Sequence, residues 1–296
     1  MKFYHASLTL KVFLKYQKLF PEKKLNVLRT FGDLNHEMKA FCKTHRDKIG
    51  SLILDSGTWT LNNAKTDLRN RISCPNYKDY VMEFENHFDF YFNFDSDFLG
   101  DTNDTNYQNQ IILEEQGLKP VPVVHYIEGD EIEHYIDREY PIVALGSSQI
   151  RTVDTLDSVM NKFKGTNIKI HLFGNARFNF ISNFPIYSCD STAWAQRGKW
   201  GFIYYWNPEK DGVDKTDKIY MEEYLDINKK REITYSNYEF RKELDKYLYE
   251  TLGVTEGNLL GPDGNYYKHL VNLHYYVQLE EIVNDIHRAK GFNIKK

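Results

Sequence analysis

Short apolar runs recur along the first two thirds of the chain. Each holds four to seven residues rich in β-branched and aromatic side chains, which is the length and composition of a buried strand. The runs are Lys2–His5, Ser51–Leu54, Phe88–Phe94, Pro120–Val124, Ile142–Leu145, Ile168–Leu172, Ile186–Cys189 and Gly201–Tyr205. Most are separated by segments long enough for a helix, and this alternation predicts parallel βαβ units.

Several of the connecting segments have apolar residues at helical spacing. Tyr77–Glu85, Asn106–Gln116 and Val153–Phe163 are the clearest, and a glycine soon after each of the last two is a helix stop signal. The connection between the first two runs is longer. It predicts two helices, of which His36–Lys48 is better defined.

Eight such units predict a protein of the α/β class with a (β/α)8 TIM barrel. A chain of 296 residues suits one barrel, which typically needs about 250. An open doubly wound sheet is the alternative. The barrel is favoured because no glycine-rich dinucleotide turn follows the first run.

The pattern changes after Tyr205. Residues 206–235 are charged and irregular and read as an insertion, in which Lys218–Tyr235 has the pattern of a hairpin. Two helical stretches follow within residues 238–290 and are expected to pack on the barrel. With no linker, repeat or low-complexity tract, residues 1–296 are predicted to form a single domain whose barrel strands lie within residues 2–205.

Composition narrows the possible partners. A net charge of −4 argues against a broad basic surface for nucleic acid, although a local basic strip remains compatible with it. The three cysteines are far apart and form no CxxC pair, so a structural zinc site has no support. No apolar run approaches the roughly 20 residues of a membrane span, and the first residues do not read as a signal peptide. We therefore expect a soluble, reduced, cytoplasmic protein without a membrane partner.

Acidic and small residues gather where the predicted strands end. In a barrel this C-terminal face carries the active site. The residues are Asp55-Ser56-Gly57, Asp95-Ser96-Asp97, His125, Gly146-Ser147-Ser148, Phe173-Gly174 and Asp190-Ser191-Thr192. Each also has a structural reading, because Asp often caps a helix, Gly often serves a turn, and His125 could be a hydrogen-bonded core residue. Three carboxylates converging at one rim are harder to explain in this way.

Converging carboxylates suit glycosyl chemistry. One can attack an anomeric carbon and form a covalent sugar–enzyme intermediate while another moves protons. A carboxylate can also accept hydrogen bonds from both N1–H and the exocyclic amine of guanine.

Six ordered motifs, each at a strand end, carry a resemblance to a known family. They are ILDSGTW at Ile53–Trp59, FNFD at Phe92–Asp95, PVVHY at Pro122–Tyr126, ALGS at Ala144–Ser147, HLFG at His171–Gly174 and YSCDSTAW at Tyr187–Trp194. The set, covering roughly residues 3–205, resembles the tRNA-guanine transglycosylase family. It is most similar to the short phage and bacterial branch that puts 7-deazaguanines into DNA.

The resemblance implies roles for the carboxylates and the base pocket. Asp190 matches the nucleophile that attacks C1′ of the target nucleoside, Asp55 the partner that transfers protons, and Asp95 the residue that holds N1 and the amino group of the base. The remaining residues implied to contact the base are Ser56, Trp59, His125, Gly146, Ser147, Phe173 and Gly174. Among these, Trp59 and Phe173 would sandwich the purine, and the loop at residues 146–147 would turn a backbone N–H toward the base carbonyl.

Arg197 is a candidate phosphate contact, with an ordinary surface arginine as the alternative.

Three departures from the family pattern bear on the substrate. Thr58 replaces a glycine, Ser147 replaces the second glycine of its pair, and the zinc module of the tRNA enzymes is missing. The last departure favours DNA over tRNA.

The function expected is therefore a pentosyltransferase that exchanges guanine in a nucleic acid for a 7-deazaguanine, without a cofactor. The protein would lie in the host cytoplasm if phage-encoded, and its oligomeric state is left open. The alternatives are an N-glycosidic hydrolase acting on a nucleoside or nucleotide, and a non-catalytic barrel that binds a nucleobase or a protein. A metal hydrolase using Asp95, Asp97 and His125 is a further possibility.

Overall fold

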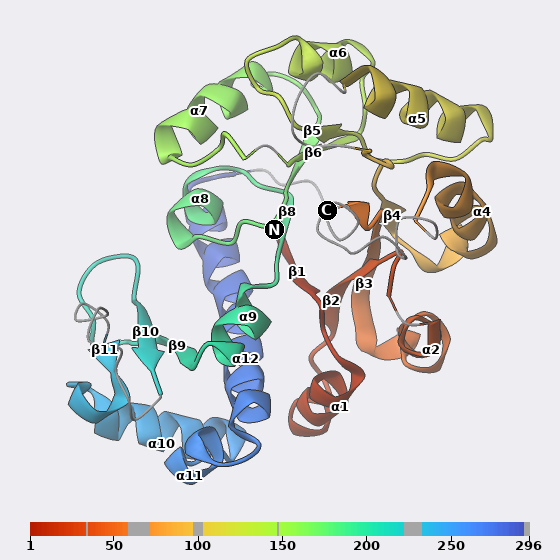
Figure 1. Ribbon diagram of the computed structural model, residues 1–296. Helices are drawn as coiled ribbons and strands as arrows, with labels where there is room; N and C mark the ends of the chain where they lie inside the picture. The colour runs from red at the N-terminus through yellow and green to blue at the C-terminus, as the bar shows by residue number, and fades with distance from the viewer. Residues whose placement is uncertain (34, 59–71, 97–102, 147, 222–232, 293–296) are drawn as a thin grey trace. The chain divides into compact units, whose positions relative to one another are not determined.

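The computed structural model describes residues 1–33, 35–58, 72–96, 103–146, 148–221 and 233–292. They fall into two compact units (Figure 1). The first comprises Met1–Ser7, Lys24–Ser191 and Ile286–Lys296, and the second comprises Leu8–Lys23 and Thr192–Asp285. Each unit has its own sheet. Whether the chain is a single domain stays a prediction.

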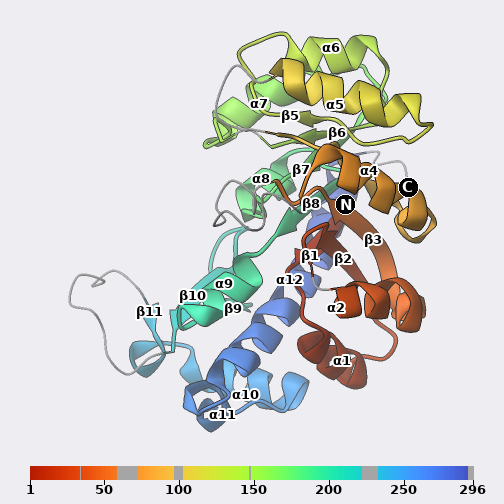
Figure 2. The ribbon, with the colours of Figure 1, turned by 45° about the vertical axis from the view of Figure 1, so that its right-hand side comes forward.

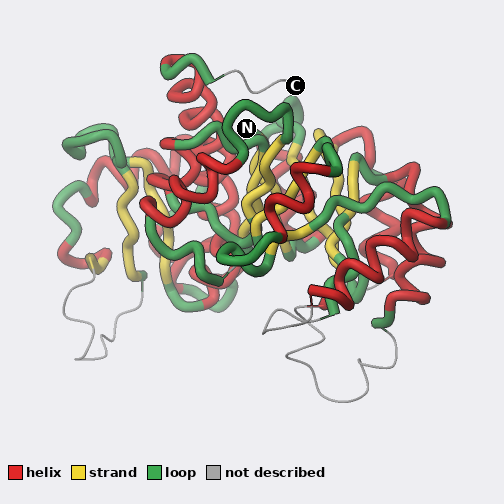
Figure 3. Tube along the Cα trace, turned by 90° about the horizontal axis from the view of Figure 1, so that it is seen from above, coloured by secondary structure: helices red, strands yellow, loops and turns green. Residues whose placement is uncertain are grey.

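The first unit is built on an eight-stranded parallel sheet. The strands are β1 (Lys2–Ala6), β2 (Leu25–Thr30), β3 (Ile49–Asp55), β4 (Phe90–Tyr91), β5 (Val123–Val124), β6 (Ile142–Leu145), β7 (Lys169–Leu172) and β8 (Ser188–Ser191). Neighbours in the sheet are neighbours in sequence, and β1 also pairs in parallel with β8. Sequential parallel order with first and last strands joined is the topology of a (β/α)8 barrel. Figure 3 shows strands, in yellow, side by side with helices, in red, around them.

The seam between β4 and β5 is held by fewer bonds than the other strand pairs. A single parallel bridge joins Phe92 to Val121. There the N–H of Asn93 donates to the carbonyl of Val121 at 2.9 Å, and the N–H of Val121 donates to the carbonyl of Tyr91 at 2.8 Å. The predicted fold class is confirmed, because these bonds connect the two remaining edges of the curled sheet.

Helices cover the outside of this sheet (Figures 1 and 2). They are α2 (Asn35–Lys39), α4 (Cys74–Phe84), α5 (Asn103–Glu115), α6 (Glu131–Asp137), α7 (Val153–Lys162) and α8 (Phe178–Asn183). Local sequence sets two of the starts. The hydroxyl of Ser73 accepts from the N–H of Asn76 at 3.4 Å, and that of Thr152 accepts from Thr155 at 3.1 Å, as N-caps do.

The inside of the barrel is an apolar core. Its buried members are Tyr4, Ala6, Leu28, Ile53, Phe90, Phe92, Val121, Val123 and Ala144. Burying each large side chain stabilises the fold by roughly 1.5–3 kcal/mol. Because side chains alternate between the two faces of a strand, residues two positions beyond this core also face inward. At the carboxyl ends of the strands these residues include Asp55, His125 and Gly146.

The second unit has a three-stranded sheet of β9 (Phe202–Trp206), β10 (Thr216–Tyr220) and β11 (Ile233–Thr234). Its helices are α1 (Leu10–Leu19), α9 (Ala193–Lys199), α10 (Arg241–Leu252), α11 (Glu256–Leu260) and α12 (Gly264–Ala289), whose last residues belong to the first unit. The side chain of Asn272 links α9 to β9, because its amide donates at 3.0 Å to the carbonyls of Trp194 and Phe202.

Three expectations about strands were wrong. Leu25–Thr30, expected within a helical connection, is β2, and its apolar pattern is broken by Arg29, whose buried guanidinium pairs with Asp33 and Glu37. Gly201–Tyr205, expected to be the eighth barrel strand, contributes β9 to the other sheet, because an apolar run signals a strand but not its partner. The hairpin expected at residues 218–235 is not formed, since β10 and β11 pair in parallel.

Among the described residues, no helix combines the length and the apolar character that crossing a bilayer requires.

Candidate active site

Asp190 lies on β8 near the carboxyl end of the strand, with only 8% of its side chain exposed. One carboxylate oxygen, Oδ1, accepts the backbone N–H of Gly174 at 2.9 Å and lies 3.3 Å from Nε2 of His171. Gly174 has φ +60°, a left-handed conformation that glycine adopts without strain. The turn after β7 is therefore shaped to bring a backbone donor to the Asp190 carboxylate.

His171 was not singled out in the sequence. It is completely buried on β7, where Nδ1 lies 2.9 Å from the hydroxyl of Ser188, and its ring centroid is 4.8 Å from those of Phe92 and Phe173. Ser188, His171 and Asp190 form a hydrogen-bonded series, but Ser188 is also fully buried. Its hydroxyl cannot reach a substrate, so the series is not a serine-hydrolase triad. The sequence did hold a signal for His171. Side chains alternate between the two faces of a strand, so His171, two positions before Phe173, is expected on the same face as Phe173.

Asp55 ends β3 and accepts the N–H of Gly57 through Oδ2 at 3.1 Å. Burial raises the pKa of the Asp55 carboxyl to about 7. The Gly57 hydrogen bond opposes this shift, and the charges of Asp190, Asp95 and Asp33 add to it. Two of the carboxylates predicted at strand ends, Asp190 and Asp95, therefore act electrostatically on the third, Asp55. A carboxyl with this pKa can give or accept a proton near neutral pH.

Asp95 forms a buried pair with His125. Its Oδ2 lies 2.9 Å from Nε2 of His125, and its Oδ1 accepts the side-chain amide of Asn93 at 3.1 Å. The segment carrying His125 is held by Glu131, which is fully buried and accepts the backbone N–H groups of His125 and Tyr126 at 2.8 Å each. Burial raises the pKa of the Glu131 carboxyl. These contacts hold His125 in place beside Asp95.

Gly146 makes room for this pair. A Cβ at this position would lie 2.9 Å from Cγ1 of Val123 and 3.3 Å from Cε1 of the His125 ring. The N–H of Gly146 donates to the carbonyl of Val124 at 2.9 Å and is therefore used within the sheet. A backbone donor from this loop to a base would have to come from a later residue, and Ser147 lies outside the described residues.

The other expected base contacts divide into three cases. Phe173 is half-buried against Phe92, with ring centroids 4.2 Å apart. Ser56 is buried and its hydroxyl lies 3.0 Å from that of Thr58, so it stabilises the turn after β3. Trp59 and Asp97 lie outside the described residues, so neither the stacking partner of Phe173 nor the metal alternative is tested there.

Arg197 belongs to the second unit, on α9. Its guanidinium carbon lies 5.1 Å from the ring centroid of Trp200, an exposed residue, and its charge acts on the Tyr204 hydroxyl. Its expected contact with a phosphate stays a prediction.

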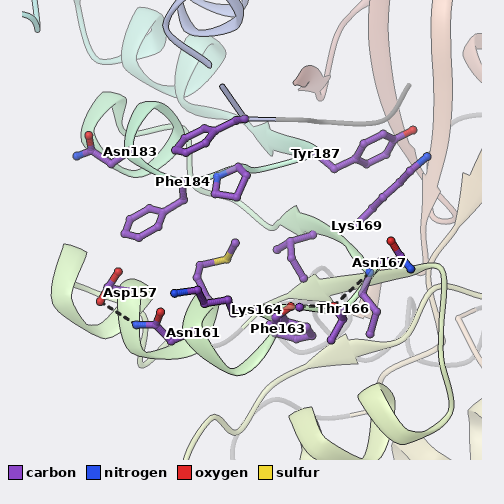
Figure 4. Close-up of a pocket in the computed structure, with 16 residues that line it drawn as sticks. Asp157, Asn161, Phe163, Lys164, Thr166, Asn167, Lys169, Asn183, Phe184 and Tyr187 are labelled. Atoms are coloured by element: carbon purple, nitrogen blue, oxygen red, sulfur yellow. Dashed lines mark hydrogen bonds between the residues drawn. The ribbon is translucent and has the colours of Figure 1, made fainter. Parts of the chain in front are cut away.

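A cavity of about 500 Å³ lies at the other end of the barrel (Figure 4). It is lined by α7 and by the segments that lead into β7 and β8, including Lys164, Asn167 and Phe184. None of the three carboxylates lines it. The cavity and the carboxylate site are therefore separate features of the first unit.

No family model matches this chain, and no curated protein matches it. A functional assignment therefore depends on the geometry of Asp55, Asp95 and Asp190 and of the groups that contact them.

Proposed function

We propose that the protein is a base-exchange glycosyltransferase that replaces guanine in a nucleic acid with a 7-deazaguanine through a covalent Asp190–sugar intermediate. The observation that carries the proposal is that Asp55, Asp95 and Asp190 lie at or just after the carboxyl ends of β3, β4 and β8, where the charges of Asp190 and Asp95 raise the pKa of Asp55. DNA is the favoured polymer over tRNA, and the cytoplasm the expected location.

The first half-reaction cleaves the bond to guanine. The target nucleotide leaves the stack, because C1′ is not accessible within a duplex. A carboxylate oxygen of Asp190 attacks C1′, and the C1′–N9 bond breaks with its electron pair moving to guanine. Asp55 in its protonated form donates the proton that neutralises the leaving base, a role supported by its pKa of about 7.

The second half-reaction reverses these steps with a different base. Asp55, now ionised, accepts a proton from the incoming 7-deazaguanine as its ring nitrogen attacks C1′. The ester bond between C1′ and Asp190 breaks, and its electron pair returns to the carboxylate. One glycosidic bond replaces another, so neither an energy source nor a redox cofactor enters the scheme.

Base recognition falls to the Asp95–His125 pair. The Asp95 carboxylate retains lone pairs beyond those directed at Asn93 and His125, and these can accept N1–H and the amine of guanine. Phe173 offers a ring face for stacking, with Trp59 as its expected partner across the purine.

The test is to incubate the protein with guanine-containing DNA, and separately with tRNA, and to look for an adduct on denaturing gels. Nucleoside mass spectrometry after addition of a 7-deazaguanine then measures exchange. Asp190→Ala is expected to abolish both adduct and exchange. Asp154→Ala, at an exposed aspartate on α7, is the matched control and should retain both. Exchange that persists in Asp190→Ala would contradict the proposal.

Hydrolysis of an N-glycosidic bond is the second candidate. Asp55, with a pKa of about 7, could take a proton from water as readily as from an incoming 7-deazaguanine. The net charge of −4 also suits a small substrate. Free-base release from a nucleoside or nucleotide, without any incoming base, would favour this reaction. Absence of release, adduct and exchange would favour a non-catalytic nucleobase-binding barrel.

A further inference from the structure

We infer that His171 is a positioning residue for Asp190, fixing one carboxylate oxygen so that the other attacks the sugar. This inference rests on the proposed function. It begins from the observation that the two oxygens of Asp190 differ in their surroundings. Oδ1 is approached by Nε2 of His171 and by the N–H of Gly174. Oδ2 has no hydrogen-bond partner within the described part of the chain.

Two donors on Oδ1 restrict rotation of the carboxylate about its last side-chain bond. Gly174 and His171 come from the same strand and turn, and Asp190 comes from the strand that pairs with it. The orientation of the carboxylate is therefore set by the register of β7 and β8 and does not depend on substrate. Such preorganisation removes a reorganisation cost from the reaction.

The proton arrangement follows from the contacts of the ring. A hydrogen bond from His171 to a carboxylate oxygen requires the proton to be on Nε2, because a carboxylate only accepts. Nδ1 of the neutral ring is then an acceptor, and the Ser188 hydroxyl at 2.9 Å is its donor. Ser188 thus selects the tautomer that His171 needs.

The aromatic surroundings keep the ring in place. His171 is fully buried, with Phe92 and Phe173 at 4.8 Å between ring centroids. Rotation of the imidazole away from Asp190 would require these rings to move, which close packing opposes.

The same donors serve the second half-reaction. When the ester bond between Oδ2 and C1′ breaks, the electron pair returns to the carboxylate and negative charge develops on both oxygens. The Nε2–H of His171 and the N–H of Gly174 stabilise that charge on Oδ1. Loss of His171 should therefore slow formation of the covalent intermediate and its release.

The experiment compares two replacements of His171, each of which keeps a polar group near a different ring nitrogen. His171→Asn keeps a polar group near the Nδ1 position and loses the donor at Nε2, whereas His171→Gln can place its amide N–H near the Nε2 position. Single-turnover rates of adduct formation and release are measured on the full chain. We expect His171→Asn to slow both steps on the order of 100-fold, and His171→Gln to recover much of that loss.

His5→Asn controls for removal of a buried histidine, because His5 lies on β1 on the strand face opposite to Tyr4 and Ala6 of the barrel core. It should leave both rates unchanged in protein that remains folded by circular dichroism. Equal rates in His171→Asn and wild type, with both folded, would overturn the inference and leave the proposed function standing.

A second readout does not require activity. Long-range ¹H–¹⁵N NMR of the histidine rings reports the tautomer of His171, which we expect to carry its proton on Nε2 and to shift in Ser188→Ala. A proton on Nδ1 would overturn the inference. If wild type forms no adduct, the proposed function fails, and this spectrum still decides how His171 and Asp190 interact.

Discussion

Two aspartates that contact or belong to strand β3 have contrasting surroundings. Asp89 lies just before β4 and bonds to the first half of β3: it is paired with Arg46 and accepts the hydroxyl of Ser51 at 2.8 Å and the N–H of Leu52 at 2.7 Å. Asp55 is the last residue of β3. Within the described part of the chain its carboxylate accepts only the N–H of Gly57, and the charges of Asp190 and Asp95 raise its pKa.

The difference in surroundings distinguishes a carboxylate that holds the fold together from one that is suited to proton transfer. Asp89 is bonded to two residues of β3 and paired with a cation, as expected for a group that holds two strands together. Burial and like charges destabilise the ionised form of Asp55, which lowers the stability of the fold at neutral pH but brings the pKa into the range of proton transfer. The groups around each carboxylate thus decide which use it has.

The largest expected effect comes from Asp55→Asn. We expect base exchange to fall roughly 100- to 10,000-fold, the range for removal of a general acid or base. Stability should change in the opposite direction. The folded-state pKa of Asp55 is raised from 3.8 to about 7. The wild-type fold therefore loses stability as pH rises through this window, whereas the variant does not.

Urea unfolding of wild type and Asp55→Asn at about pH 4, pH 5.5 and pH 8 measures that difference. The variant should gain up to a few kcal/mol relative to wild type between the lowest and highest pH. A constant difference across the series would show that Asp55 titrates normally, and the contrast with Asp89 would then be lost.

An intermediate effect is expected for Gly146→Ala. The added methyl would meet Val123 and the ring of His125, so one of them must shift. We expect a loss of roughly 1–3 kcal/mol in stability, as for overpacking, and weaker base binding through displacement of His125 from Asp95. Calorimetric titration with guanine measures the second effect. Gly257→Ala is the control, because an added Cβ there would meet only Oγ1 of Thr255 at 3.8 Å and, as at Gly146, φ is not positive.

The smallest effect should come from Asp89→Asn. Losing the ion pair and weakening two hydrogen bonds should cost about 1 kcal/mol of stability, because Asp89 is partly exposed. Base exchange should be unaffected, since Asp89 lies away from the strand ends that carry the site. Thermal denaturation and the exchange assay, run in parallel on Asp89→Asn and Asp55→Asn, sharpen the comparison. A fall in exchange for Asp89→Asn beyond its loss of folded protein would contradict it.

Local signals in the sequence were sufficient for much of the architecture. Apolar runs located seven of the eight barrel strands, because a buried strand needs only a few consecutive β-branched or aromatic residues. The aspartates after the second, third and seventh of the predicted strands were the basis for predicting a shared site. The structure adds that the charges of Asp190 and Asp95 raise the pKa of Asp55, and the shared site itself stays a prediction. Ser73 and Thr152 begin their helices as caps because capping depends on neighbouring residues alone.

Other features depended on partners distant in the chain. Leu25–Thr30 and Gly201–Tyr205 are both short apolar runs, and only pairing with β1 and β3 in one case and with β10 in the other assigned them to different sheets. The use of the Gly146 N–H within the sheet, which removes it as a donor to a base, likewise follows from pairing with β5.

The sequence by itself determined that this chain alternates strands and helices and that carboxylates follow several of the strands. Both are properties of residues close together in the chain. Only the tertiary structure decided that His171 lies beside Asp190 and that the pKa of Asp55 is about 7. Strand register brings together residues 19 positions apart, and burial withdraws water from a carboxyl near two others. Neither effect exists until the barrel has closed.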